Sequence, residues 1–223
     1  MKWELKVELG RKLIHLTSIL ILLIYTQIGQ YSTRLALFTL TIILVLLLEF
    51  QYVRLDFEKK PRIIRYIEQF RREKEKNHIG GEVFFMIGAI IALAIFDFRI
   101  AATAILMTTF GDLTAALIGK RFGKHRVFRL QKTWEGTISA LATNLLIGWL
   151  FVRSATDGTI WYLSGGILPY GTPIWPVIIT MAITATFIEA ITNKLDDNLL
   201  IPIFSGFNGQ IVLILLSAQV ILV

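Results

Sequence analysis

The chain has no cysteine, which excludes disulfide bonds and metal sites built on thiolates. Its three histidines, His15, His78 and His125, are too far apart in the sequence to form a zinc-binding motif. The sequence also lacks a G-x-S-x-G elbow, a Walker loop and a dinucleotide fingerprint. The chain therefore carries no sequence signature of a zinc site, a serine-hydrolase elbow or a phosphate-binding loop of the Walker type.

Long apolar runs dominate what remains, since 55% of the 223 residues are hydrophobic and they fall in blocks. Crossing the hydrocarbon layer takes roughly 20 apolar residues of helix. Blocks close to this length predict helices at residues 13–30, 35–53, 79–96, 100–118, 134–152 and 175–192. No small-residue cleavage site follows the first block, so we expect a retained helix there and not a signal peptide.

The last block, residues 199–223, is interrupted by Pro202, Gly206 and Gly209. It is either one kinked helix or a re-entrant stretch followed by a short span. We therefore predict an all-α integral membrane protein with about seven transmembrane helices, forming a single catalytic domain over residues 1–223.

The distribution of positive charge predicts the topology. Of the 23 lysines and arginines, all but Arg34, Arg99 and Arg153 lie before the first predicted span or in alternate connections. Cytoplasmic segments of membrane proteins collect lysine and arginine. The N-terminus and the connections around residues 54–76 and 120–132 are therefore predicted to be cytoplasmic.

One of these connections, "PRIIRYIEQFRREKEK" at residues 61–76, has the pattern of a surface helix. Pro61 suits a first helical position, and Ile63, Ile67 and Phe70 fall on one face opposite a basic face. Such a helix is expected to lie along the anionic inner leaflet. A solvated positive loop is the alternative, and it explains the charge but not the apolar stripe.

Two acids lie within predicted spans, Asp112 and Glu189. An ionisable group inside a span costs at least about 2.5 kcal/mol unless it is paired or functional. A structural ion pair is the alternative for each acid, but both are predicted at the same depth near the cytoplasmic end. Arg11 and His15 share a helix face and form a polar stripe that enters the membrane from the same side.

The stretch "GDLTAALIGKRFGKHRVFRLQKTWEGT", residues 111–137, adds groups that suit a phosphate. Lysine and arginine bind phosphates, and glycines let the backbone approach them closely. Carboxylates and carboxamides are the hard oxygen ligands that Mg²⁺ prefers. The residues therefore predict a magnesium–nucleotide site at the cytoplasmic surface, reached by an amphiphilic substrate from the bilayer. Helix capping by Thr133, Glu135 and Gly136 is the alternative for "KTWEGT", and it leaves Lys132 unexplained.

Three separated segments resemble the polyprenol kinase family, which comprises dolichol kinase, phytol kinase and CTP-dependent diacylglycerol kinase. "ELGRKLIHL" is similar to the E-x-x-R-K-x-x-H opening of the family, and residues 111–137 to its G-D-x-x-A-x-x-x-G-K-x-x-G-K…K-T-x-E-G core. "EAITNKLDDNLLIP" is similar to its closing E…D-N-x-x-I-P. The resemblance spans residues 8 to 202. It implies transfer of the γ-phosphate of CTP to a membrane prenyl alcohol of the phytol, geranylgeraniol, dolichol or polyprenol type, giving lipid monophosphate and CDP.

The expected roles follow from phosphoryl-transfer chemistry and the resemblance. The predicted catalytic residues are Asp112, Lys132, Glu135 and Glu189. The predicted nucleotide-binding residues are Gly119, Lys120, Arg121, Gly123, Lys124, Lys132, Thr133, Gly136 and Asn198. Arg11, Lys12 and His15 are expected at the lipid head or a phosphate, and Asp112, Glu189 and Asp197 at Mg²⁺. Whether Asp112 is a metal ligand or the base that receives the hydroxyl proton stays open.

Two other functions are weighed against the kinase. Phosphatidate cytidylyltransferases also use CTP, and "GKRFGK" supplies their K-R pair, but no P-G-H-G-G or D-R-x-D follows. A transporter or scaffold would need inverted repeats, and none is visible between the halves. The choice of CTP over other nucleotides rests on the resemblance alone. The expected partners are the lipid alcohol, CTP and anionic inner-leaflet lipids, with no nucleic acid; a homodimer stays open.

Overall fold

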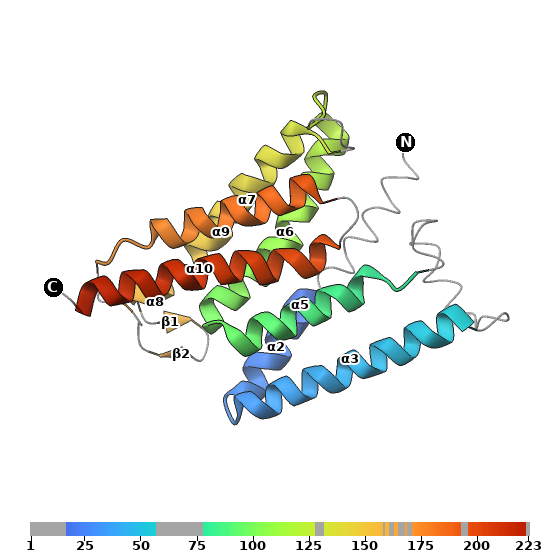
Figure 1. Cartoon of the computed structure of the whole chain (residues 1–223), viewed down its shortest axis with the longest axis horizontal. Helices are drawn as coiled ribbons and strands as arrows, with labels where there is room; N and C mark the ends of the chain where they lie inside the picture. The colour runs from blue at the N-terminus through green and yellow to red at the C-terminus, as the bar shows by residue number, and fades with distance from the viewer. Residues whose placement is uncertain are drawn as a thin grey trace. The chain divides into compact units, whose positions relative to one another are not determined.

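The computed structural model describes residues 17–56, 78–127, 132–157, 159–160, 163–164, 168, 171–192 and 196–221. These residues are almost entirely helical (Figure 1). The helices are α2 (Thr17–Gly29), α3 (Thr33–Asp56), α5 (Gly81–Ile95), α6 (Phe98–Phe122), α7 (Trp134–Val152), α8 (Ser154–Asp157), α9 (Trp175–Ile191) and α10 (Asp197–Ile221). The predicted surface helix at 61–76 lies outside the described residues.

Four helices, α3, α6, α7 and α10, are long and apolar enough to cross a membrane, and α2, α5 and α9 are shorter apolar helices. The prediction of an all-helical chain with about seven apolar helices is confirmed. The side of the membrane on which each connection lies stays a prediction. The chain divides into two compact units, Met1–Ile87 and Gly88–Val223, so α5 begins in the first and ends in the second.

In the first unit, α2 packs on α3, and the end of α3 holds a buried arginine. Arg54 is 0% exposed; its Nε donates to Oε1 of Gln51 over 2.8 Å and its Nη2 to the carbonyl of His78 over 2.6 Å. Gln51 in turn donates to Glu82, at the start of α5. The sequence assigned Arg54 to the connection after this helix. This was wrong because α3 extends three residues beyond its predicted end and includes Arg54.

In the second unit, α6 is the central helix. It packs against α7, α9 and α10, and every residue from Phe98 to Thr109 is buried (Figure 1). A helix that is buried on all sides forms the core of a bundle. α6 begins at Asp97, whose side chain caps the helix by accepting from the amide of Arg99 over 2.9 Å.

The C-terminal block forms one continuous helix, α10, and not a re-entrant stretch. Two of the residues that suggested an interruption make room for neighbours. A Cβ on Gly206 would stand 2.5 Å from the ring of Phe96, and one on Gly209 would stand 2.5 Å from Cγ of Met181 on α9. These glycines therefore permit close helix packing, while Pro202 lies in the second turn of α10.

Two short elements were not predicted. α8 follows α7 after one residue, and β1 (Thr159–Ile160) pairs antiparallel with β2 (Leu163–Ser164). Two-residue strands leave no period-2 pattern that a sequence could show.

Candidate functional site

The end of α6 and the start of α7 cross at a pair of glycines. A Cβ on Gly136 would stand 2.7 Å from the carbonyl oxygen of Ala115 and 3.3 Å from Cα of Gly119. A Cβ on Gly119 would stand 2.8 Å from Oγ1 of Thr133. Close packing of the two helices therefore requires glycine at both positions, independently of any phosphate.

Thr133 is the N-cap of α7, and its Oγ1 accepts from the amide of Gly136 over 3.3 Å. The capping alternative drawn from the sequence is thus confirmed for Thr133. A nucleotide-binding role for Thr133, Gly119, Gly123 and Gly136 stays a prediction.

The carboxylate of Glu135 anchors the connection between α6 and α7. Its Oε1 accepts from the amides of Lys124 and His125 over 3.1 and 3.3 Å, and lies 2.9 Å from Nδ1 of His125. The same connection is closed by backbone bonds of 2.9 Å from Val127 to Lys132 and from Trp134 to His125. Glu135 therefore orders this connection, and a catalytic role for it stays a prediction.

Lys132 connects this region to two helices that are distant in the sequence. Its Nζ donates to the main-chain carbonyl of Glu189, in the last turn of α9, and lies 3.5 Å from Oδ2 of Asp197, the first residue of α10. The side chains of Lys132 and Asp197 are 28% and 30% exposed, so solvent reaches both. Glu189 is buried. The structure thus brings together three of the predicted site residues.

The start of α10 is fixed by Asp196. Its Oδ1 accepts from the amide of Asn198 over 3.0 Å and from the side-chain nitrogen of Asn198 over 2.7 Å. Asp196 therefore acts as an N-cap, which holds the neighbouring carboxylate of Asp197 in place. The predicted contact of Asn198 with a nucleotide stays a prediction.

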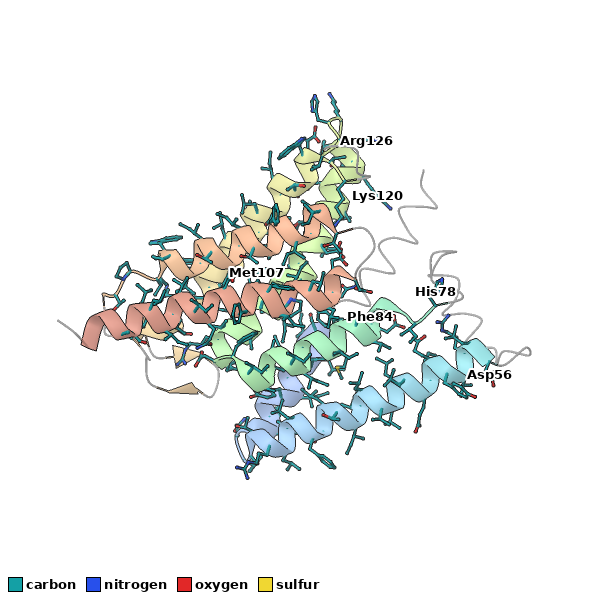
Figure 2. All side chains as sticks on the ribbon, in the orientation of Figure 1. Asp56, His78, Phe84, Met107, Lys120 and Arg126 are labelled. Carbon is teal, nitrogen blue, oxygen red and sulfur yellow. The ribbon has the colours of Figure 1, made fainter. Side chains whose placement is uncertain are left out.

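The remaining cations cluster at the end of α6. Lys120 and Arg121 lie in its last helical turn, where positive charge complements the helix dipole, and Lys124 and Arg126 follow; all four are exposed. Figure 2 shows Lys120 and Arg126 at the same end of the helix, beside the connection to α7. The sequence ended this helix at residue 118 and counted Lys120 and Arg121 as loop residues, which was wrong by one turn.

Asp112 lies eight residues before Lys120 on α6 and is half-buried. At 1.5 Å per residue, their Cα atoms are separated by about 12 Å along the helix. Asp112 therefore lies deeper in the bundle than the exposed cations. The predicted lipid-head residues Arg11, Lys12 and His15 lie outside the described residues.

One buried polar residue, Asn144, was not among the predicted site residues. Asn144 is a carboxamide on α7 that donates a hydrogen bond to Thr186 on α9. A carboxamide within an apolar span is also unusual, since it must find a partner away from water. That signal was available in "LATNLLIGWL".

Binding of Mg²⁺ by Asp112, Glu189 and Asp197 stays a prediction. Among the described residues, no three His, Cys, Asp or Glu side chains lie close enough together to hold a metal ion. Mg²⁺ bound with a nucleotide needs only one or two carboxylates, because water and phosphate oxygens complete its shell. The carboxylate of Asp197 lies beside Lys132, while Glu189 contacts this lysine through its main-chain carbonyl.

The four long apolar helices define the class, a multi-pass membrane protein. The chain is 28% identical over 211 residues to CTP-dependent diacylglycerol kinase 1 of Schizosaccharomyces pombe, covering 92% of this chain and 93% of the relative. It is 30% identical over 142 residues to phytol kinase of Synechocystis sp., covering 60% and 55%. It is 27% identical over 206 residues to chloroplastic phytol kinase 1 of Arabidopsis thaliana, covering 88% and 64%.

The chain therefore spans nearly all of the first relative and under two thirds of the other two. No protein-family model matches the sequence, and no solved structure matches it. The resemblance found in the motifs is confirmed. Over most of its length the chain is a distant homologue of diacylglycerol, phytol and dolichol kinases, the polyprenol kinase family.

Proposed function

We propose that this chain is a lipid kinase that transfers the γ-phosphate of CTP to the hydroxyl group of a membrane lipid alcohol. The observation that carries the proposal is the meeting of Lys132 with Glu189 and Asp197, which follow it by 57 and 65 residues. The segment that resembles the family core, which contains Lys132, thereby contacts the segment that resembles the closing motif, which contains Glu189 and Asp197. A lysine beside the carboxylate of Asp197, next to the last turn of α9 that carries Glu189, supplies the kinds of group that bind a magnesium–nucleotide.

The reaction moves one phosphoryl group. The oxygen of the lipid hydroxyl forms a bond to the γ-phosphorus, and the bond from this phosphorus to the β–γ bridging oxygen breaks. CDP leaves with that electron pair, and the hydroxyl proton passes to a base, a role that we assign to Asp112. Such reactions are accelerated mainly by positioning and by neutralising charge.

The other residues would bind and orient the nucleotide. Lys132 would move from Asp197 to the phosphates, and the exposed Lys120 and Lys124 would meet the phosphate tail. Glu189 and Asp197 would hold Mg²⁺, which neutralises charge on the β- and γ-phosphates when it is bound. Arg11, Lys12 and His15 are proposed at the lipid head group.

The acceptor would reach the site from the bilayer. α7 and α9 expose large apolar side chains, among them Ile138 at 63% and Phe187 at 61% exposure, as expected of helices that face lipid. We propose a prenyl alcohol as the acceptor. The name of the Schizosaccharomyces pombe relative makes diacylglycerol the first competitor to test.

The experiment is an assay of detergent-purified protein with magnesium, with CTP, ATP or GTP as donor, and with phytol, geranylgeraniol, a polyprenol or diacylglycerol as acceptor. We expect lipid monophosphate and CDP in equal amounts, with CTP preferred. If diacylglycerol were the only acceptor phosphorylated, it would replace the prenyl alcohol as the proposed substrate. Absence of phosphate transfer to every acceptor would refute the kinase.

A further inference from the structure

A carboxamide is enclosed by three helices of the second unit. Asn144 on α7 is 1% exposed, and its Nδ2 donates to Oγ1 of Thr186 on α9 over 3.0 Å. Its Oδ1 accepts no hydrogen bond from any of the residues that the structure describes. A buried acceptor without a donor is unfavourable, so packing alone would be better served by leucine at this position.

The third wall of this enclosure is Gly111 on α6. A Cβ on Gly111 would stand 2.6 Å from Oδ1 of Asn144 and 3.2 Å from its Nδ2. Glycine at position 111 therefore leaves room for the amide, which a Cβ would displace. The amide is tied to α9 by a hydrogen bond and rests directly on the backbone of α6.

Gly111 and Thr186, the two residues that contact Asn144, each lie close in sequence to an acid of the proposed site. Asp112 directly follows Gly111 on α6, and Glu189 follows Thr186 by three residues, on the same face of α9. The amide thus sets how far the backbone that carries Asp112 stands from the helix that carries Glu189.

We propose that Asn144 is a positioning residue, which with Gly111 and Thr186 fixes the register of Asp112 against Glu189. The inference rests on the proposed kinase function and adds to it a buried residue that touches no substrate. A shift of about 1 Å in a reacting group can lower a rate about a hundredfold. The loss of one hydrogen bond between membrane helices has only a small effect on stability. Rate and stability should therefore separate.

The chain offers a matched control on the same helix. Asn208 on α10 donates from Nδ2 to Oγ1 of Thr184 on α9, also over 3.0 Å, in a part-buried pair. Thr186→Val and Thr184→Val each remove one hydroxyl and keep the shape of the side chain. We expect a small shift in Tm for each variant. We expect a tenfold or larger fall in kcat for Thr186→Val with an unchanged KM for CTP, and a kcat within twofold of wild type for Thr184→Val.

Two further variants complete the rate test. Thr186→Ser keeps the hydroxyl and should restore kcat to within threefold of wild type. Asn144→Leu should lower kcat as Thr186→Val does. Equal falls in kcat for Thr186→Val and Thr184→Val, or a fall that Thr186→Ser does not relieve, would overturn the proposal.

A second measurement does not depend on activity. Because the chain has no cysteine, spin labels at Phe122→Cys on α6 and Ile191→Cys on α9 report the distance between these helices alone. We expect Asn144→Leu and Thr186→Val to shift or broaden that distance distribution, and Thr184→Val to leave it unchanged. An unaltered distribution in the first two variants would overturn the proposal. Lack of kinase activity in the wild type would instead refute the proposed function, while the distances would still decide the role of Asn144.

Discussion

At the level of single side chains, the proposed chemistry depends most on Asp112. This half-buried carboxylate follows a stretch of α6, Phe98 to Thr109, in which every residue is buried. Asp112→Asn keeps the size of the side chain and removes its charge. We expect turnover to fall about a hundredfold or more, as for an essential acid–base group, with near-normal melting. The measurement is kcat and Tm on one detergent preparation.

Asp97→Asn is the control, because Asp97 caps the opposite end of the same helix and pairs with Arg99 over 3.5 Å. It should lower Tm and leave turnover in the folded fraction unchanged. If Asp112→Asn behaved in this way as well, Asp112 would be structural.

Lys132 is predicted to bind phosphate and not to stabilise the fold. An ion pair as exposed as that of Lys132 with Asp197 contributes roughly 0–1 kcal/mol. Lys132→Met should therefore leave Tm nearly unchanged. It should lower kcat/KM for CTP about tenfold or more, since a hydrogen bond to a charged group is worth about 1.5–3 kcal/mol. Lys132→Arg should retain part of the activity. A Lys132→Met variant with full kcat/KM would remove this residue from the site.

The sequence predicted Lys132, Glu189 and Asp197 as site residues, and the structure brings them together. It missed Asn144, because the search was for charge and a carboxamide carries none. It offered capping by Thr133 as an alternative, which the structure confirms. It could not show that Glu135 binds two backbone amides, since these contacts depend on how the connection folds back on α7.

At the level of helices, the close crossing of α6 and α7 determines the position of Lys132, which lies two residues before the start of α7. Gly136→Ala would place a methyl group 2.7 Å from the carbonyl of Ala115, so the helices must separate. Overpacking of this kind costs about 1–3 kcal/mol, and we expect a lower Tm together with a higher KM for CTP. Ile138→Ala, at an exposed position on the same helix, is the control and should change neither quantity appreciably. A normal Tm and KM in Gly136→Ala would show that the crossing is not tight.

Helix positions were predictable where hydrophobic runs are bounded by polar residues, as in α7 and α9, whose observed bounds match to within one residue. Helix positions were less predictable where a helix contains residue types that are also common in loops, such as lysine, arginine and glycine. α6 runs on through Lys120 and Arg121 because cations suit a helix C-terminus, and α10 runs through Gly206 and Gly209 because these face Phe96 and Met181. Such packing reasons are visible only in three dimensions.

For the whole molecule, the distribution of lysine and arginine predicts which connections are cytoplasmic. Because the chain lacks cysteine, single cysteines can be introduced without background. In intact cells, Arg65→Cys and Arg126→Cys should resist a membrane-impermeant maleimide, and Asp157→Cys should react. All three should react after the membrane is opened. Labelling of position 126 from outside would place the α6–α7 connection on the other side.

The central claim is that the γ-phosphate of CTP ends on a lipid hydroxyl. The most direct test supplies CTP labelled with ³²P in the γ position to one sample and in the α position to another, each with magnesium, purified protein and the best acceptor. We expect the γ label in the lipid monophosphate and the α label in free CDP, and Asp112→Asn should form both labelled products about a hundredfold or more slowly. An α label in the lipid, with the γ label in pyrophosphate, would contradict it and identify a cytidylyltransferase.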